Sequence, residues 1–331
     1  MKASKIYYNY LRYLKGFLYS IKFNLKFLFS FLKNKKVIIF QFHSASQLIH
    51  IEDLIYTIQR DHKNFEIYFS SYFIEFKAVK NIFPHVKIFP LESTLWIIFY
   101  KVVYGLDQKM YFPITNFFGK RIVGFHGQPT KGNSFVNINK LFVDYYYAYG
   151  PAMIQEINRS IKSSPIKIKK IGQCKTDKIF NTKPKTFKRT KIRNILIAPS
   201  FELCSLFSIF HDQILKTNFN EIKNNITFLP HPAFYNEVNE MDDYFRGTLN
   251  NKNWADKIKI LNTFKNVKFP KNLEERSLIK LKNFDLIITD YSGISFESIY
   301  YKIPFGFIDC EPYSSNYFKT KFNVDPELFS K

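Results

Sequence analysis

The chain has 331 residues, enough for two globular domains, and its 46% hydrophobic and 23% charged residues exclude a disordered or collagen-like polypeptide. The excess of 49 Lys and Arg over 27 Asp and Glu gives a net charge of +22, which favours an anionic partner such as a phosphorylated substrate, an acidic lipid surface or nucleic acid. The three cysteines are far apart and lack Cys-x-x-Cys spacing, which argues against a disulfide framework or a zinc site and favours a reducing cytoplasm.

The first segment, residues 1–36, is predicted to form a basic amphipathic helix, because it contains nine Lys or Arg and no acid. Its apolar side chains share one arc: Tyr7, Tyr10, Leu11, Leu14, Leu18, Ile21, Leu25, Leu28 and Leu32. The basic side chains occupy the neighbouring arc: Lys5, Arg12, Lys15, Lys22, Lys26 and Lys33. The uncharged runs are too short to span a bilayer or to form a signal-peptide core. The helix either lies on an anionic membrane, at the cytoplasmic face of the cell membrane, or packs on its own domain with a solvated basic edge; the unbalanced positive charge favours the membrane.

From residue 37 onward, short apolar runs alternate with helical patterns, which predicts an α/β fold with mainly parallel sheets. The first series begins with a strand at Val37–Phe42 and a helix over Leu48–Arg60. Its further strands are expected at Glu66–Phe69, Val86–Phe89 and Arg121–Phe125. The strands of a second series are expected at Asn194–Ala198, Ile226–Leu229, Val267–Phe269, Asp285–Thr289 and Phe305–Ile308.

The two series define two Rossmann-like domains, residues 37–180 and 194–331, joined by a basic linker over residues 181–193. Open α/β sheets bind ligands at the carboxyl ends of their strands, so two such domains facing each other across a cleft would bind a substrate between them. The residues that directly follow the strands are therefore the candidates for chemistry.

One candidate is the turn from Asp290 to Glu297, which joins a buried strand to a helix expected over Phe296–Lys302. The first turn of a helix offers backbone N–H groups to an anion, and hydroxyl groups add further donors. The residues that would surround a phosphate and a ribose are Ser292, Gly293, Ser295 and Glu297. The alternative is an ordinary helix start, in which one of the two serines satisfies the helix amides.

A second candidate is His231, which follows the strand at residues 226–229 and lies between Pro230 and Pro232. The prolines keep the backbone extended, so the histidine is expected to point out of the end of the sheet. There it would donate to a diphosphate and assist the departure of a nucleotide. The alternative is an ordinary surface or packed histidine.

A third candidate is the loop Gly124–Gly132, which follows the strand at residues 121–125. Its glycines permit close approach, His126 is a candidate base, and Lys131 is a charge for phosphate. The alternative is a plain glycine-containing loop. Neither a Walker loop nor a dinucleotide fingerprint occurs, and no Asp-x-Asp follows a strand, so no cofactor and no metal ion are expected.

In this order the segments resemble the CDP-glycerol glycerophosphotransferases, the family of the teichoic-acid primases and polymerases. The family motifs are His-Gly-x-Pro-x-Lys, Gly-x-Pro-Arg-x-Asp, Ala-Pro-Thr-Trp, His-Pro and Asp-Tyr-Ser-Ser-x-x-Phe-Asp. Their counterparts here are His126–Lys131, Gly172–Asp177, Ala198–Phe201, His231–Pro232 and Asp290–Glu297. The chain departs from the pattern at Cys174, Lys175, Gly293 and Glu297, and at Glu202, where the family commonly has a basic residue.

The resemblance implies a GT-B-like fold with the acceptor side in the first domain and the nucleotide donor in the second. It implies a transferase that moves glycerol-phosphate or a similar polyol-phosphate from a CDP-linked donor to a hydroxyl of a membrane-linked surface glycan, releasing CMP. His126 would then be the catalytic base, and His231 would act at the donor diphosphate. The resemblance also implies a set of donor-binding residues: Lys131, Ser200, Tyr291, Ser292, Gly293, Ser295 and Glu297.

Two other functions fit parts of the sequence. A GT-B glycosyltransferase that uses a nucleotide-sugar to build capsule or another surface polysaccharide needs the same diphosphate site. A non-catalytic basic protein that binds nucleic acid or membrane would use the +22 charge. The basic residues concentrate in residues 1–36 and in the linker rather than in a recognition helix, so nucleic acid is not the expected partner.

Overall fold

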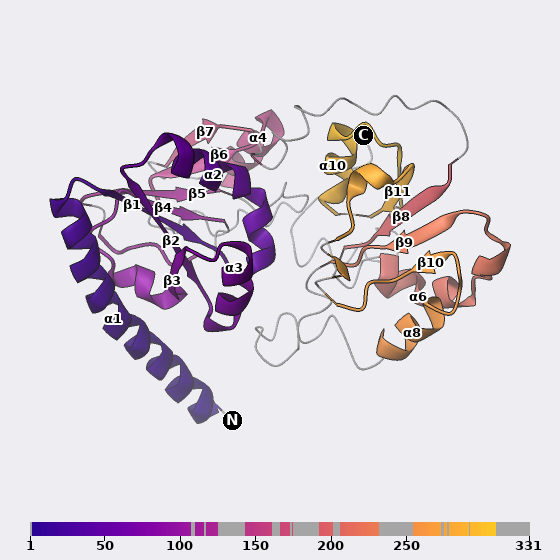
Figure 1. Cartoon of the computed structure of the whole chain (residues 1–331), viewed down its shortest axis with the longest axis horizontal. Helices are drawn as coiled ribbons and strands as arrows, with labels where there is room; N and C mark the ends of the chain where they lie inside the picture. Colours follow the sequence, from indigo (N-terminus) through magenta and orange to yellow (C-terminus); the bar gives the residue numbers. More distant parts are fainter. Residues whose placement is uncertain are drawn as a thin grey trace. The chain divides into compact units, whose positions relative to one another are not determined.

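In the computed structural model, two α/β units follow one another along the chain, Met1–Asp177 and Lys178–Lys331 (Figure 1). The structure describes residues 2–106, 110–115, 117–124, 143–160, 166–172, 174, 192–200, 206–231, 254–272, 275–276, 278–290 and 292–308. The predicted linker at residues 181–193 lies outside these ranges apart from its last two residues.

The first unit is built on a seven-stranded parallel sheet with the order β3-β2-β1-β4-β5-β6-β7. Its strands are β1 (Lys36–Gln41), β2 (Phe65–Ser71), β3 (Lys87–Pro90), β4 (Val102–Gly105), β5 (Lys120–Val123), β6 (Tyr145–Ala148) and β7 (Lys167–Lys170). Its helices are α1 (Lys2–Leu32), α2 (Glu52–Asp61), α3 (Phe76–Ile82) and α4 (Pro151–Ser160), with 3-10 helices η1 (Ala45–His50), η2 (Phe73–Glu75) and η3 (Leu91–Trp96).

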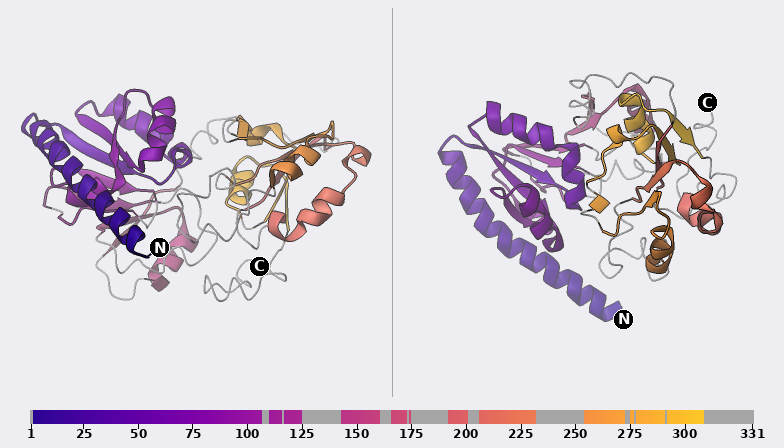
Figure 2. Two further views of the ribbon diagram at one scale, coloured as in Figure 1. Left: turned by 90° about the horizontal axis from the view of Figure 1, so that it is seen from below. Right: turned by 45° about the vertical axis from the view of Figure 1, so that its right-hand side comes forward.

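Helices cover both faces of this sheet because successive residues of each buried strand point to opposite sides. Val37 and Ile39 of β1 face a core that also contains Phe23 and Phe27 of α1 and residues of α4. Ile38 and Phe40 face a second core formed with α2 and α3. The two further views of the ribbon show α1 lying along one side of the unit (Figure 2).

The second unit has a five-stranded parallel sheet with the order β10-β9-β8-β11-β12. Its strands are β8 (Asn194–Ala198), β9 (Asn225–Phe228), β10 (Val267–Lys268), β11 (Leu286–Thr289) and β12 (Phe305–Phe307). Its helices are α6 (Leu206–Lys216), α8 (Trp254–Leu261) and α10 (Ile294–Tyr300), with 3-10 helices η7 (Phe219–Glu221) and η10 (Leu281–Asn283). Residues of α6 and α8 pack on one face of the sheet, and residues of α10 pack on the other.

The predicted α/β class is confirmed: the chain has two units with parallel sheets and an N-terminal helix. Every strand expected from the sequence is present, with ends displaced by one or two residues. The sequence patterns did not single out β4, β6 and β7, which have four residues each and lack a long apolar run. The helix expected over Phe296–Lys302 is found two residues earlier as α10, which ends before Lys302 takes a left-handed backbone conformation (φ 55°).

Candidate functional site

The candidate site in the second unit lies where three neighbouring strands end. Ser200 follows β8, His231 follows β9 and Ser292 follows β11. The strands are parallel and β8 lies between the other two, since Ile197 pairs with Phe228 on one side and with Ile288 on the other. Neighbouring strands lie about 4.8 Å apart, so the backbones at the ends of β9 and β11 are separated by roughly 10 Å. Sheet topology therefore gathers residues that are far apart in sequence.

Asp290 organises this edge of the sheet. It is fully buried, and its two carboxylate oxygens accept different backbone donors: Oδ1 accepts from the amide of Ser200 at 2.8 Å and Oδ2 from the amide of Leu206 at 2.7 Å. Thr289, the last residue of β11, donates its hydroxyl to the carbonyl of Ala198 at 2.6 Å. One carboxylate thus fixes both described ends of the loop that follows β8. Asp290 had no predicted role, although it is the first residue of the Asp-Tyr-Ser segment.

Ser200 has a hydroxyl that is available for a ligand. The residue is only 7% exposed, and its Oγ has no hydrogen-bond partner among the residues that the structure describes. A buried hydroxyl without a partner costs free energy, and a ligand that provides an acceptor removes this cost. The position of Ser200 at the end of the central strand is consistent with its predicted part in donor binding.

The turn after β11 is held by its own serines. The hydroxyl of Ser295 donates to the carbonyl of Ser292 at 2.9 Å, and the amide of Ser295 donates to the same carbonyl at 3.2 Å. Gly293 precedes α10 with an ordinary right-handed backbone (φ −59°), and the hydroxyl of Ser292 accepts a long hydrogen bond, 3.5 Å, from the amide of Ile294, the first residue of α10. Glu297 lies half-buried in the first turn of α10. Ser295 therefore serves the shape of the turn, and Ser292 supports the start of α10, as the alternative of an ordinary helix start predicts.

His231 is half-buried and lies three residues after the end of β9. The preceding residue, Pro230, accepts a hydrogen bond at its carbonyl from Nε of Arg276 at 2.6 Å. Arg276 thus fixes the backbone that positions His231, and it brings a positive charge to the carboxyl end of β9. Sequence patterns did not reveal Arg276, because 46 residues separate it from Pro230 and no motif contains it.

The predicted site residues of the first unit lie outside the described residues. The structure describes β5 up to Gly124, and both His126 and Lys131 belong to the segment 125–142 that comes next. Gly124 is required by the fold, since a Cβ at this position would collide with the hydroxyl of Tyr104. Tyr104 is buried, and burial raises the pKa of its hydroxyl well above the usual value. The glycine therefore has a structural reason in addition to the expected access for a ligand.

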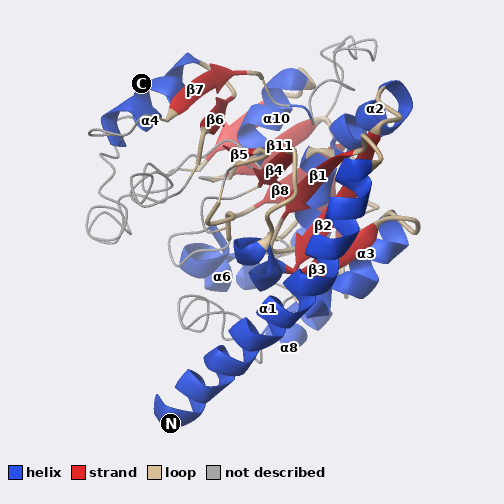
Figure 3. Cartoon of the chain, turned by 90° about the vertical axis from the view of Figure 1, so that its left-hand side faces the viewer, coloured by secondary structure: helices blue, strands red, loops and turns tan. Residues whose placement is uncertain are grey.

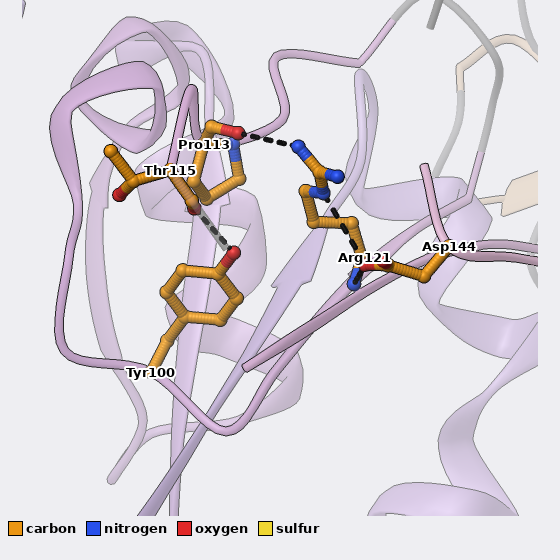
Figure 4. A network of polar contacts seen from close by, with 5 residues as sticks. All are labelled: Tyr100, Pro113, Thr115, Arg121 and Asp144. Carbon is orange, nitrogen blue, oxygen red and sulfur yellow. Dashed lines mark hydrogen bonds and ion pairs between the residues drawn. The ribbon is translucent and has the colours of Figure 1, made fainter. Parts of the chain in front are cut away.

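The amino ends of β5 and β6, the two strands that flank the segment 125–142, are joined by an ion pair (Figure 4). Arg121 of β5 contacts Asp144, the residue before β6, through its backbone amide at 2.8 Å and through Nε at 3.3 Å. The guanidinium also donates to the carbonyl of Pro113 at 3.3 Å. Nearby, the hydroxyl of Tyr100 donates to the carbonyl of Thr115 at 2.7 Å. These contacts hold the two strands that the segment with the predicted base connects.

A further histidine lies at the carboxyl edge of the first sheet. His43 follows β1, its ring lies 5.4 Å from the ring of Tyr72, and its amide donates to Gln47 at 2.8 Å. The same loop is held by Glu75, which follows β2 and accepts from the amide of Ala45 at 2.7 Å. His43 was not among the predicted site residues, because it lies in no motif; its place directly after a buried strand is the signal that could have found it.

The structure therefore places five predicted donor-side residues in one region of the second unit and leaves three predicted residues undescribed. The residues placed at or after the ends of β8 and β11 are Ser200, Ser292, Gly293, Ser295 and Glu297, with His231 beside them after β9. The residues outside the described ranges are His126, Lys131 and Tyr291. Within the described ranges, no group of three or more His, Cys, Asp or Glu side chains could hold a metal ion.

Comparisons with known proteins find similarity at the level of the fold. No protein-family model matches the sequence, and no curated protein matches it. Among solved structures, the wall teichoic acid polymerase TagF superposes with a TM-score of 0.52 at 14% identity, covering 91% of this chain and 78% of TagF. A histidine-to-asparagine variant of TagF superposes with a TM-score of 0.51 at 13% identity, covering 92% of this chain and 81% of that chain. The chain thus has the GT-B-like fold of TagF.

Proposed function

We propose that this protein is a transferase that moves glycerol-phosphate or a similar polyol-phosphate from a CDP-linked donor to a hydroxyl of a membrane-linked surface glycan. The observation that carries the proposal is the convergence of the Ser200 hydroxyl, His231 and the turn at Ser292 at one sheet edge. Two features support it: the ordered series of motifs in the sequence, and the fold shared with a teichoic acid polymerase. Because the acceptor is membrane-linked, we place the enzyme at the cytoplasmic face of the cell membrane.

In the proposed reaction the acceptor oxygen forms a bond to the phosphorus of the polyol-phosphate while the bond from that phosphorus to CMP breaks. His126 takes the proton of the acceptor hydroxyl, because a hydroxyl is a weak nucleophile until its proton is removed. CMP leaves with the electron pair of the broken bond, and His231 and Lys131 stabilise the negative charge on the departing phosphate. Ser200 and Ser292 donate hydrogen bonds to the diphosphate, and Glu297 and Tyr291 face the remainder of the nucleotide.

The test is a donor panel. The purified chain is incubated with CDP-polyols and with nucleotide-sugars, each with and without a glycan acceptor, and the released nucleotide is identified. We expect CMP from a CDP-polyol. His126→Ala and His231→Ala are expected to reduce turnover by at least a factor of about 100, the typical contribution of a positioned acid or base. Full turnover in both variants would disprove the assignment of these roles.

A matched pair of serine variants tests the donor site. Ser200→Ala is expected to raise the donor KM about tenfold, since it removes a hydrogen bond to a charged group. Ser298→Ala is the control, because Ser298 is also buried but its hydroxyl donates to the carbonyl of Ile294 within α10 at 2.8 Å. If both variants behave like the wild type, Ser200 does not bind the donor.

Two outcomes of the donor panel would contradict the proposal and identify a different function. Release of a nucleotide diphosphate from a nucleotide-sugar, with no CMP from any CDP-polyol, identifies a GT-B glycosyltransferase that uses the same site for a sugar donor. Affinity for nucleic acid without turnover of any donor identifies a non-catalytic basic protein.

A further inference from the structure

Two opposite faces of α1 differ in what they contact. The face that packs on the first unit is made of small and aromatic residues: Gly16, Ser20, Phe23, Phe27 and Ser30. At Gly16 a Cβ would lie 2.8 Å from the Cβ of Glu92, so the helix backbone approaches η3 as closely as a glycine allows. Phe23 and Phe27 pack against Tyr68 and Phe89 of the sheet. This inner face accounts for the attachment of α1 to its own unit.

The opposite face of α1 is apolar and exposed. At 100° per residue its centre lies about 180° from the centre of the inner face. It consists of Leu14, Leu18, Ile21, Leu25, Phe29 and Leu32, which we call the leucine stripe. Leu18 is 58% exposed, Phe29 63% and Leu32 67%. Figure 3 shows the helix running along the outside of the sheet, with no described helix or strand of the first unit drawn over its outer side. Six large apolar side chains at helical spacing form a continuous exposed surface, which a monomeric soluble protein rarely presents.

Tertiary structure extends the leucine stripe on one flank with aromatic residues from elsewhere in the sequence. Trp96 contacts Phe17 with a ring separation of 5.5 Å, and Phe118 contacts Phe31 at 5.6 Å. Asn24 fixes this flank, because its side chain donates to the carbonyl of Trp96 and accepts from the amide of Ile98, both at 2.8 Å. Phe117 is 81% exposed beside them in sequence. We call Trp96, Phe117 and Phe118 the aromatic flank.

The other flank of the leucine stripe is positively charged. Lys15, Lys22 and Lys33 are exposed and lie between the stripe and the inner face in the helical projection. No acid occurs in the first 36 residues. Apolar side chains bordered by lysines on one side and by Trp and Phe on the other match the boundary between lipid headgroups and acyl chains. No described helix is long and apolar enough to cross a bilayer.

We infer that the leucine stripe and the aromatic flank together dock on the surface of an anionic lipid bilayer, with α1 lying in the plane of the membrane. The lysine flank favours lipid over a second copy of this chain, since an antiparallel two-fold contact between two such helices would bring lysines against lysines, and residues 1–36 contain no acid to compensate. Because the residues of the aromatic flank lie outside α1, the docking surface forms only in the folded unit and not in the isolated helix. This membrane contact does not depend on the identity of the donor, and it goes beyond the proposed chemistry.

Vesicle sedimentation of the full-length protein tests the inference. Vesicles of phosphatidylcholine mixed equally with phosphatidylglycerol are compared with vesicles of phosphatidylcholine alone. We expect at least tenfold stronger partitioning onto the anionic vesicles, because each lysine near an anionic surface contributes about 1 kcal/mol. The double substitution Leu18→Glu and Leu25→Glu is expected to reduce partitioning at least tenfold. Leu278→Glu, at a residue of the second unit that is 68% exposed, is the matched control and is expected to bind like the wild type.

Two further variants separate the parts of the surface. The double variant Trp96→Ser with Phe117→Ser leaves the sequence of α1 unchanged and is expected to reduce partitioning onto anionic vesicles several-fold. Replacement of Lys15, Lys22 and Lys33 by Gln is expected to abolish the preference for phosphatidylglycerol. Circular dichroism confirms that each variant is folded, and turnover of a soluble donor is expected to be unaffected by Leu18→Glu with Leu25→Glu, so a failed docking surface is distinguishable from a failed enzyme.

Three results would overturn the inference. The first is equal vesicle binding by the wild type and by the leucine-stripe variant. The second is a loss of binding in Leu278→Glu that matches the loss in the stripe variant. The third is a concentration-dependent dimer, measured by analytical ultracentrifugation, that the stripe variant dissociates while no form of the protein binds vesicles.

Discussion

The carboxyl edges of the two sheets are held by the same device, a carboxylate after one strand that accepts the backbone amides of the loop after the neighbouring strand. In the first unit Glu75, after β2, accepts from the amide of Ala45, after β1. In the second unit Asp290, after β11, accepts from the amides of Ser200 and Leu206, after β8. Short loops at a sheet edge need such an acceptor, because their amides have left the ladder and are still shielded from water.

The two carboxylates differ in burial and in the number of amides they serve. Asp290 is fully buried and uses both oxygens, whereas Glu75 is half-buried and also accepts from the Ser44 side chain. Burial raises the pKa of Glu75 above its usual value, and the hydrogen bonds from Ala45 and Ser44 oppose this rise. The carboxyl edge of the second sheet therefore depends on both oxygens of one buried carboxylate, while the carboxyl edge of the first sheet depends on a carboxyl group whose pKa is raised by burial.

The largest effect is expected from breaking the donor-side edge with Asp290→Asn. An amide has one acceptor oxygen, so one of the two backbone N–H groups would lose its acceptor and face an NH2 group. We expect the free energy of unfolding of the second unit to fall by about 3 kcal/mol, and donor turnover to be lost with it. Urea denaturation followed by circular dichroism measures the first effect.

Asp285→Asn is the matched control for that prediction. Oδ2 of Asp285 accepts from the amides of both Arg193 and Asn194, at 3.1 and 2.9 Å, and the oxygen of an asparagine placed there can still accept from both. We expect a loss below about 1 kcal/mol. Equal losses in the two variants would show that Asp290 has no special place in the unit.

The next effect sharpens the comparison at the first sheet, where an ion pair joins the amino ends of β5 and β6, the strands that flank the segment with His126. Arg121→Met would leave Asp144 without its charged partner near the protein interior. We expect a loss of about 2 kcal/mol in the unfolding free energy of the first unit. Arg60→Met is the control, because its pair with Asp61 is exposed and should leave the unfolding curve unchanged. A negligible effect of Arg121→Met would show that the pair is not structurally important.

A smaller effect is expected from Arg276→Gln at the donor-side edge. Gln can still donate to the carbonyl of Pro230 but carries no charge and has a shorter reach. We expect turnover to fall about tenfold, with little change in stability, because His231 loses part of its support while the fold is retained. Steady-state kinetics with the best donor measures this effect, and Arg276→Lys should recover part of the turnover. If Arg276→Gln lowers the stability without changing kcat, Arg276 has only a structural role.

The smallest expected effect is a pH dependence of the unfolding stability that arises from Glu75, at the carboxyl edge of the first sheet. The pKa of Glu75 is higher in the folded chain than in the unfolded one, so the unfolded state ionises first as the pH rises. The contribution of Glu75 to stability is therefore fully present below the ordinary glutamate pKa and is lost as the pH rises through the folded value. Glu75→Gln removes this dependence while the amide oxygen still accepts from Ala45. We expect the stability of the variant relative to the wild type to increase from about pH 4 to neutral pH, as measured by urea denaturation at each pH. A stability difference between Glu75→Gln and the wild type that stays constant with pH would contradict a raised pKa of Glu75 in the folded chain.

Local patterns were sufficient to predict much of the fold and part of the candidate site. Apolar runs such as Val37–Phe42 and Asn194–Ala198 predicted buried parallel strands, because a strand covered on both faces must be apolar at successive positions. The motif residues after β8 and β11 were found for the same reason, since the residues at the carboxyl end of a buried parallel strand lie at the ligand-binding edge of the sheet. His126 and Lys131 remain predictions from the sequence.

The amino-acid sequence by itself predicted a basic amphipathic helix over residues 1–36, since helical periodicity is a local property; the helix is α1, Lys2–Leu32, and Lys36 already belongs to β1. Only the tertiary structure decided which side of α1 packs on the first unit. Gly16 and Ser20 lie on the packing side because small residues allow close backbone approach, and the leucines on the opposite side are therefore exposed. The roles of Asp290, Arg276 and the aromatic flank also depend on the tertiary structure. Asp290 binds Ser200 from 90 positions away, Arg276 binds Pro230 from 46 positions away, and Trp96 contacts Phe17 from 79 positions away. Contacts over such separations depend on how strands are ordered in a sheet, which no local pattern records.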